Sequence, residues 1–495
     1  MTRPPHPLVR QLPLELHRNE GRVIPRMFAI YGETRFHFLV QRICELSDEL
    51  VAGTLNQVFS LFRERHKDLR TVFIEHFELV AELADYTGDL DENRRLLVGS
   101  YFTMEYSLEA AALFNPSIVK HPCQDGLEPN ACRFVMSLRA TGEGHISSVV
   151  FRTGTIQGND AITLDPPARF SVHAKRMPDQ FFLKPLFLRK LTEMSVNKSH
   201  AEQMLASLPE RFIYSELKAA VEQTVGAFSQ ETGITETVEC IYWLAQSNYQ
   251  VRMPEDADIS DIVLFPQSES EARGIEDVRL VQFTDDDGAQ TYYGTYTAFN
   301  GTHILPMLLE TSDFKDIQIH TLNGPCARDK GMALFPKRVN GHYAMCSRID
   351  GRNLYMMYSD YVHFWESAVL LAEPEYPWEL TIIGNCGAPL ETDEGWLLLT
   401  HGVGPMRQYC IGAMLLDLED PTRIIGRLRE PLLFTREEER EGYVPNVVYT
   451  CGAMQHEGIL YIPYAMADRY TSMASVDMDA LLTCLRNGNG KGINA

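Results

Sequence analysis

The sequence lacks several patterns that mark common protein classes. None of its 10 cysteines forms a CxxC pair and most lie inside apolar runs, so we expect buried free thiols in a reducing compartment. The first residues, "MTRPPHPLVRQLPLELHRNEGR", contain no apolar core of a signal peptide. No apolar run reaches the roughly 20 residues that span a bilayer. These absences predict a cytoplasmic protein that is not inserted in a membrane.

An excess of positive charge is also missing. The sequence has 45 Lys and Arg against 67 Asp and Glu, which gives a formal net charge of −22. Such acidity opposes nonspecific binding to nucleic acid or to anionic membranes, so we expect neither as a partner, although a local basic pocket is compatible with it. The sequence contains no HExxH, no HxH and no His/Cys pair at ligand spacing, and we therefore expect no transition metal.

The chain of 495 residues is long enough for one large domain with an appendage, or for two to three domains. Residues 1–30 look irregular. From about 36 to 114, apolar residues recur at three- and four-residue spacing with few Gly or Pro, which predicts helices. A second helical stretch, about 171–232, interrupts a β-rich remainder. We therefore predict a helical N-terminal extension over 1–111 and a catalytic domain over 112–485.

Self-similarity within the β-rich part is the most informative pattern. Similar segments begin at Tyr292, Tyr343, Trp396 and Leu460, which are 51, 53 and 64 residues apart. Such a period is typical of a β-propeller with three or four strands per blade. The larger gap after Phe134 holds the helical stretch. We predict a mainly β fold: a five-bladed β-propeller with a helical N-terminal extension and a helical insertion. An unrelated β-rich sandwich is the alternative. The five aligned segments are "FVMSLRA", "YYGTYTA", "YAMCSRI", "WLLLTHG" and "LYIPYAM".

Basic side chains recur at one position of these segments. Five residues after each start stand Arg139, Thr297, Arg348, His401 and Ala465, so three of five are potentially cationic. Equivalent positions of successive blades face the same axial site, and cations gathered there in an acidic protein favour an anion pocket. The alternative is that they pair with acidic neighbours and close the propeller. Taken alone, His401 in "THGVG" would be typical of a core histidine.

The stretch "RGIEDVRLVQF" places Glu276 and Asp277 at the entrance of a strand-like run. Asp277 can donate a proton only if burial or a neighbouring acid raises its pKa. Arg279 points to the same face if the segment is extended, and it would oppose that rise. Asp468 in "YAMADRY" falls outside the repeat register and is a candidate for binding sugar hydroxyls. Asn115 in "FNPSIV" opens the first blade, where a turn before a strand is its ordinary role.

Motifs in the β-rich part follow one another in a specific order. They resemble glycoside hydrolase family 130, the β-mannoside phosphorylase and β-mannosidase family, over about 112–165 and 240–482. The resemblance implies a five-bladed propeller and an inverting reaction at a β-mannosidic bond, with inorganic phosphate as co-substrate and no other cofactor. The motifs are "FNPSIV", "SLRATGEGHISS", "GIEDVRL", "YYGTYTAFNG", "ALFPKRVNGHYAMCSR", "GWLLLTHGVG", "YCIGAMLLDLEDP" and "YVPNVVYTCGAMQHEGILYIPYAMAD".

The resemblance also implies roles for individual residues. Asp277 matches the general acid, which protonates the leaving oxygen, in the favoured proposal through a sugar hydroxyl. Phosphate attacks C1 of the non-reducing mannose and yields α-mannose 1-phosphate. Val278 stands where proline is common, and Ile382 where some phosphorylases carry lysine. The remaining implied residues are Arg348, His401, Lys337 and Arg338 for phosphate, and Asn115, Arg139, Glu276, Arg279 and Asp468 for the mannoside.

Three functions are compatible with these residues. The retained cations favour a phosphorylase that acts on a β-mannoside oligosaccharide. An inverting exo-β-mannosidase on the same scaffold would use Glu143 or Glu276 as base, at roughly 6.5–9.5 Å from the acid. A non-catalytic carbohydrate-binding propeller would have no activity for Asp277→Asn to remove. The N-terminal helices are expected to pack or to form a homo-oligomer.

Overall fold

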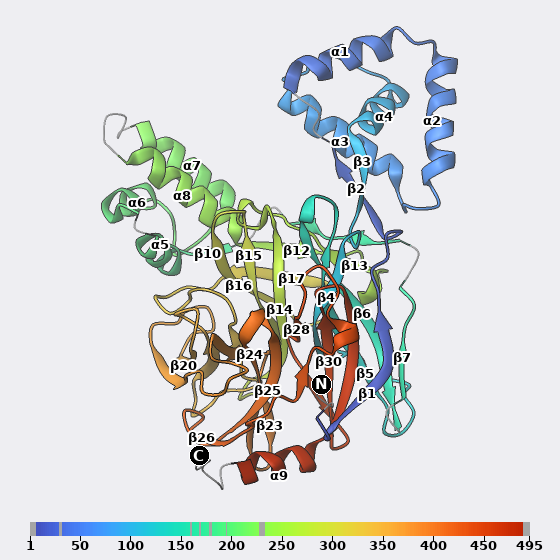
Figure 1. Cartoon of the computed structure of the whole chain (residues 1–495). Coiled ribbons are helices and arrows are strands. Elements are labelled where there is room, and N and C mark those ends of the chain that lie inside the picture. Colours follow the sequence, from blue (N-terminus) through green and yellow to red (C-terminus); the bar gives the residue numbers. More distant parts are fainter. Residues whose placement is uncertain are drawn as a thin grey trace.

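Strands dominate the computed structural model, and most of its helices gather in two regions (Figure 1). The chain is therefore mainly β with helical additions, as predicted. No helix among the described residues is both long and apolar enough to cross a membrane. The structure describes residues 6–28, 32–158, 161–167, 170–177, 181–194, 196–226 and 233–488. Residues 1–5 and 29–30 of the segment predicted to be irregular, and 178–180, 195 and 227–232 of the predicted insertion, lie outside the described residues.

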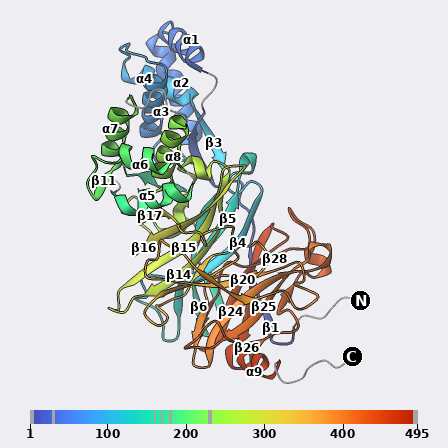
Figure 2. The same ribbon diagram turned by 90° about the vertical axis from the view of Figure 1, so that its left-hand side faces the viewer.

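The N-terminal helices lie beyond one end of the β-sheets in both views (Figures 1 and 2). Asp68 and Asp91 cap two of them by accepting a backbone N–H, and Phe36, Phe73 and Leu96 fill their common core. Helices in this region were predicted, but the chain turns to strand before residue 114. The elements are α1 (Gly32–Cys44), α2 (Asp48–Phe62), α3 (Leu69–Leu83) and α4 (Glu92–Tyr101), with β2 (Val23–Met27) paired to β3 (Thr103–Ser107) beneath them.

The expectation that residues 1–30 are irregular is wrong. Strand β1 (Val9–Leu16) pairs antiparallel with β31 (Tyr470–Asp477) and buries Leu12 and Leu14. Pro13 made the segment look irregular, but it lies where the register shifts, and a bulge tolerates a residue without an N–H donor. The beginning of the chain thus completes the last sheet.

Most of the other strands form four larger sheets. The first has 12 strands: β4 (Ala112–Lys120), β5 (Cys132–Thr141), β6 (Ser147–Gln157), β7 (Ala161–Leu164), β8 (Val172–His173), β9 (Lys175–Arg176), β12 (Tyr249–Arg252), β13 (Ile262–Leu264), β14 (Gly274–Thr284), β15 (Gln290–Phe299), β16 (Ile304–Thr311) and β17 (Asp316–Thr321). The second has four: β18 (Ala333–Leu334), β19 (Tyr343–Ser347), β20 (Leu354–Ser359) and β21 (Ala368–Ala372).

The remaining two sheets come from the C-terminal part of the chain. Each of the five segments aligned in the sequence lies in a strand between two neighbours: β5, β15, β19, β24 and β30. The third sheet has β22 (Ile382–Asn385), β23 (Leu390–Thr392), β24 (Gly395–Val403), β25 (Tyr409–Leu416), β26 (Ile424–Arg427) and β27 (Leu433–Phe434). The fourth has β1, β28 (Val448–Tyr449), β29 (Met454–His456), β30 (Ile459–Met466) and β31, followed by α9 (Met478–Gly488).

Apolar clusters join the sheets in chain order. The 12-stranded sheet packs on the four-stranded sheet through residues such as Phe283 and Trp365, and the four-stranded sheet packs on the next through Phe335 and Trp396. Clusters around Leu397 with Leu460, and around Leu12 with Phe134, complete the series. Hydrophobic burial thus brings the last sheet back against the first.

The helical insertion is longer than predicted. Its last helix continues to Ser247 because Ile234, Ile241, Leu244 and Ala245 recur at helical spacing and are buried. At its start, residues 172–176 are strands of the 12-stranded sheet rather than helix. The helices are α5 (Lys184–Glu193), α6 (Lys198–Met204), α7 (Tyr214–Val225) and α8 (Ile234–Ser247), with β10 (Phe181–Leu183) and β11 (Arg211–Ile213) paired beside them.

Candidate active site

Asp277 lies in a backbone bulge near the start of β14. Its φ is 57°, and the register between β14 and β15 shifts between Glu276 and Arg279. Asn115 has φ 50° at a similar register shift in β4. Asp and Asn tolerate this left-handed conformation better than most residues. The two side chains meet across the strands, where Asn115 Nδ2 donates to Asp277 Oδ1 at 2.6 Å.

Two cations balance the adjacent acids. Arg139 Nη2 donates to Glu276 Oε1 at 2.8 Å, and Arg139 Nη1 lies 3.4 Å from Asp277 Oδ1. Arg139 Nε donates to Ser147 Oγ at 2.9 Å, which fixes the guanidinium plane. Lys330 Nζ lies 2.5 Å from Glu276 Oε2. Asp277 is thus one of a largely buried acid pair, with 19% of its side chain exposed.

A second group of cations begins two residues further along β14. Arg279 donates to the carbonyl of Asn385 at 2.9 Å and to the hydroxyl of Tyr449 at 2.6 Å. His401 Nδ1 lies 3.2 Å from the same carbonyl, and Arg348 Nη1 lies 3.3 Å from His401 Nε2. The carbonyl of Asn385 therefore connects the acid-bearing strand to the predicted phosphate ligands Arg348 and His401.

Two side-chain oxygens in this site lack partners. The Oδ1 atoms of Asn115 and Asn385 are buried and accept no hydrogen bond from any residue that the structure describes. An unsatisfied buried acceptor costs about 1–3 kcal/mol, so such atoms favour a ligand that brings donors. Hydroxyl groups of a sugar are donors of the right kind.

The pKa of Asp277 lies below its ordinary value. Burial acts to raise this pKa, but the positive charges of Arg139, Arg279 and Lys330 and the hydrogen bond from Asn115 together outweigh burial. Asp277 is therefore ionised near pH 7 in this arrangement. To serve as a proton donor, it needs some of this positive charge to be neutralised.

His401 is neutral for a related reason. Burial, and next the charges of Arg348 and Arg279, hold the pKa of His401 well below its usual range. A neutral ring that carries its proton on Nδ1 donates to the Asn385 carbonyl and accepts from Arg348 through Nε2. One tautomer thus satisfies both observed contacts.

Asp468 is the second unusual acid of the site. It follows β30 with φ 49°. Burial, and next the negative charge of Asp277, raise the pKa of Asp468 to about 7, while Arg139 opposes the rise. The two aspartates therefore have pKa values pushed in opposite directions, which is a common arrangement in acid–base sites.

We expect Asp468→Asn to change how stability depends on pH. Because the folded-state pKa is raised above 3.8, native Asp468 holds a proton that the unfolded chain releases. Its contribution to the free energy of unfolding therefore falls as pH rises from about 4 to about 7, by up to ~1.4 kcal/mol per pH unit. Urea unfolding at pH 4.5 and pH 8 checks this, to the nearest ~0.5 kcal/mol. The stability of the variant relative to the unchanged protein should rise with pH, and an equal difference at both pH values would contradict the assignment.

Two of the predicted phosphate ligands lie elsewhere. Arg338 Nε donates to Asp285 Oδ1 at 2.7 Å, just beyond the end of β14. Eight residues of strand, or roughly 26 Å, separate Asp285 from Asp277. Lys337 Nζ pairs with Glu391 Oε1 at 2.6 Å on the surface. Both residues precede β19, whereas Arg348 follows it at the opposite end of that strand, so the structure does not bring them together with Arg348 and His401.

Arg279 does not share a strand face with Asp277, contrary to expectation. The bulge after Glu276 breaks the alternation of side chains, so Arg279 turns to Tyr449 instead. Among the described residues, no hydrogen bond or ion pair joins Arg279 to Asp277. Arg279 therefore influences the acid through its charge rather than through contact.

Three residues of the site were not predicted from the sequence. Lys330 lies in the loop before β18, Asn385 ends β22, and Tyr449 lies in β28. Tyr449 belongs to the motif "NVVYTCGAM", and Asn385 lies three residues after Ile382, which stands where some phosphorylases carry lysine. Lys330 in "ARDKGM" gives no signal beyond its position ahead of the "ALFP" motif.

Comparison with known proteins gives one family match. Residues 244–487 match a family model described as beta-1,4-mannooligosaccharide phosphorylase. A 1,2-beta-oligomannan phosphorylase of Thermoanaerobacter is 33% identical over 220 residues, covering 44% of this chain and 72% of that protein. A beta-1,2-mannobiose phosphorylase of Listeria innocua is 32% identical over 222 residues, covering 43% and 60%. A solved structure of a beta-1,2-mannobiose phosphorylase from Listeria innocua in complex with beta-1,2-mannobiose gives a TM-score of 0.44 at 18% identity, covering 77% of this chain and 93% of that one.

Proposed function

The chain belongs to glycoside hydrolase family 130, and from this premise we propose that it is an inverting β-mannoside phosphorylase. It cleaves the non-reducing-end mannose of a β-mannoside with inorganic phosphate and releases α-mannose 1-phosphate. The observation that carries the proposal is the sequence similarity to the 1,2-beta-oligomannan phosphorylase, which spans most of that protein. The chain is accordingly an enzyme that acts on glycosides.

The charge arrangement supports attack by phosphate. Arg348 and Arg279 are largely buried cationic donors near the acid, suited to an oxyanion, and His401 lies in contact with Arg348. Phosphate is proposed to bind at Arg348 and His401, and the mannosyl unit to contact Asn115, Arg139 and Asp468. The bond from C1 to the leaving oxygen breaks as the bond from phosphate oxygen to C1 forms, on the opposite face of the sugar.

Phosphate binding would also prepare Asp277 for its role as the acid. Its pKa is low because three cations surround it without enough opposing charge. A phosphate near Arg279 brings negative charge that offsets this effect, and a sugar between Asp277 and Arg139 weakens their contact. Both changes raise the pKa of Asp277, so it can carry the proton that the leaving oxygen receives.

The hydrolytic alternative would use Glu276 or Glu143 as its base. Both carboxylate oxygens of Glu276 are engaged, one by Arg139 and one by Lys330. Glu143 lies exposed in a short turn. Neither side chain is arranged to activate water beside Asp277.

We further propose that the four larger sheets make up a five-bladed propeller. Among the residues that the structure describes, the pairing of Gly274 with Ser147 is the only ladder link between β6 and β14, so the 12-stranded sheet divides naturally into two blades there. The ring of apolar clusters and the pairing of β1 with β31 support closure of the blades into a circle. In that arrangement the bulges at Asn115 and Asp277 belong to innermost strands of adjacent blades.

Product analysis tests the function directly. With β-1,2-mannobiose and phosphate, we expect α-mannose 1-phosphate and mannose in equal amounts by ³¹P and ¹H NMR. Without phosphate, cleavage should fall to background. Release of free mannose at the same rate without phosphate would instead identify a β-mannosidase. A parallel reaction with β-1,4-mannobiose assigns the linkage, for which the names of the relatives favour β-1,2.

A further inference from the structure

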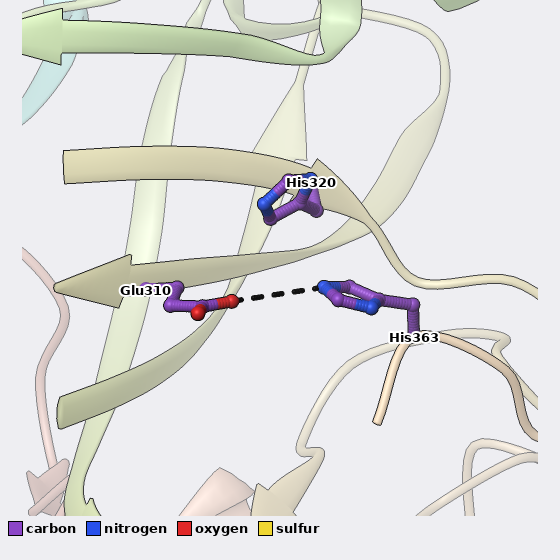
Figure 3. Close-up of side chains that lie close together, drawn as sticks. All are labelled: Glu310, His320 and His363. Carbon is purple, nitrogen blue, oxygen red and sulfur yellow. Dashed lines mark ion pairs between the residues drawn. The ribbon is translucent and has the colours of Figure 1, made fainter. Parts of the chain in front are cut away.

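Three side chains that commonly ligate metals meet outside the candidate active site. Glu310 belongs to β16, His320 to β17 and His363 to the loop between β20 and β21 (Figure 3). Each offers one ligand atom, and these atoms all lie within 4.8 Å of one another. His363 Nε2 lies 3.9 Å from Glu310 Oε2, and the centroids of the two imidazole rings are 4.6 Å apart.

The fold holds these residues together. Glu310 and His320 are diagonal neighbours on one face of the antiparallel β16–β17 pair, which brings their side chains within reach. His363 lies in a loop that joins two strands of the four-stranded sheet, and the N–H of Asn323, two residues beyond β17, donates to the His363 carbonyl at 2.9 Å. The cluster therefore spans the junction of the 12-stranded and four-stranded sheets.

The cluster is incompletely satisfied without a further partner. His363 Nε2 is buried and makes no hydrogen bond with any described residue. Burial, and next the charge of His363, lower the pKa of His320 to about 3, and burial lowers that of His363 to about 4. Both rings are neutral near pH 7, which is the form that ligates metals. Burial also raises the pKa of Glu310. A cation in the cluster would offset that effect.

We propose that Glu310, His320 and His363 form a binding site for a divalent transition metal, with Zn²⁺ the best match. Two imidazoles and one carboxylate are a donor set of zinc sites that keep a fourth position open. Bonds of about 2.1 Å place ligand atoms ~3.4 Å apart on a tetrahedral ion, so side-chain shifts of roughly 1 Å bring all three onto one ion.

A neighbouring cavity leaves room for the fourth ligand. It has a volume of about 160 Å³ and is lined by His320, His363 and residues of α5 and α8. Lys190 lines the same cavity, but its Nζ donates to the Leu322 carbonyl at 3.1 Å and lies 3.4 Å from Glu193 Oε2. The charge of Lys190 is thus engaged elsewhere, and a water molecule can occupy the open position.

The proposed ion would act as a structural cross-link. It would join β16 and β17 to the loop before β21, which α5 already contacts through the ion pair of Arg189 with Glu366. The ion would lie away from the candidate active site. Glu276 is level with Thr297 and Pro306 across the neighbouring strands, and Glu310 lies four residues, or roughly 13 Å, beyond Pro306 along β16. The ion is therefore expected to stabilise the fold without entering the glycosidic reaction.

Metal titration of the full-length protein tests the proposal. After treatment with a chelator and dialysis, Zn²⁺ measured by calorimetry should bind with one equivalent and raise the melting temperature. Co²⁺ should give the visible bands of a nitrogen- and oxygen-ligated ion. His320→Ala and Glu310→Gln should each weaken Zn²⁺ binding at least ~10-fold. Replacing a residue that only hydrogen-bonds to a metal ligand typically lowers metal affinity by that much.

Two controls keep the outcome decisive. His342→Ala removes an imidazole from an exposed pair with Asp360, a similar chemistry without a third ligand, and should leave Zn²⁺ affinity unchanged. His363→Gln keeps the side-chain volume and guards against misfolding, which the melting temperature without metal reports. The proposal is overturned if no stoichiometric Zn²⁺ binds or if the His320, His363 and Glu310 variants bind Zn²⁺ as tightly as the unchanged protein. It is also overturned if Co²⁺ shows sulfur charge-transfer bands that place it on the free cysteines.

Discussion

Replacing Asp277 with asparagine is expected to lower kcat for phosphorolysis of a mannobiose by about 1000-fold. General acid catalysis typically contributes 10²–10⁴-fold, and the leaving hydroxyl of a sugar needs a proton. Asn115 can still donate to the amide oxygen of the variant, so the bulge in β14 should persist. The measurement is steady-state release of mannose 1-phosphate at saturating phosphate, with circular dichroism to verify folding.

A substrate with a different leaving group distinguishes a proton donor from a residue that only positions the substrate. The phenolate of an activated aryl β-mannoside departs without being protonated, so Asp277→Asn should retain much more of its activity on that substrate. An equal loss on both substrates would contradict the assignment of Asp277 as the acid. Asp285→Asn is the matched control, because Asp285 also pairs with an arginine but lies at the far end of the same strand. It should leave both activities unchanged.

Much of the fold was accessible from the sequence because it repeats. Each segment that begins with Phe134 or one of its four counterparts became a strand between two neighbours, since similar patterns of burial select similar strands. Strand β1 was missed because its partner, β31, lies more than 450 residues away, and a local pattern with Pro13 carries no sign of it. Helix α8 was not predicted, although its buried Ile234, Ile241 and Leu244 recur at helical spacing.

The site was predicted less evenly. Asp277, Asn115 and Arg139 lie together in the structure. No sequence pattern reveals the two strand bulges that orient the side chains of Asp277 and Asn115 toward each other. The same bulge invalidated the inference that Arg279 faces Asp277, because alternation assumes regular strand. The division at residue 111, the cytoplasmic location and self-association through the N-terminal helices stay predictions.

The Glu310–His320–His363 cluster shows a different limit of prediction from the sequence. A search for metal motifs relies on ligands at fixed short spacing, and none was found. These three residues are 10 and 43 positions apart and meet only because two sheets pack together. The expectation of no metal therefore rested on motifs alone and could not test a site assembled by tertiary structure.

Arg348→Ala is expected to raise the KM for phosphate by about 10- to 100-fold while changing the KM for the mannoside little. A hydrogen bond to a charged group is worth about 1.5–3 kcal/mol, which corresponds to this range. Arg348 contacts His401 and lies near Asp329, and none of the groups proposed to hold mannose contacts it among the described residues. Initial rates at varied phosphate and fixed, saturating mannoside give the two constants separately.

Arg338→Ala is the control that makes this result specific to one place in the fold. The family resemblance proposed both arginines as phosphate ligands, but Arg338 pairs with Asp285 at the other end of β14. Its removal should leave the KM for phosphate unchanged, because a cation roughly 26 Å from the acid is screened across more than two Debye lengths at physiological salt. A large effect of Arg338→Ala with none of Arg348→Ala would place the phosphate at the outer end of the sheet. In that case the donors around His401 would have to serve the sugar instead, and the proposed rise in the pKa of Asp277 on phosphate binding would lose its cause.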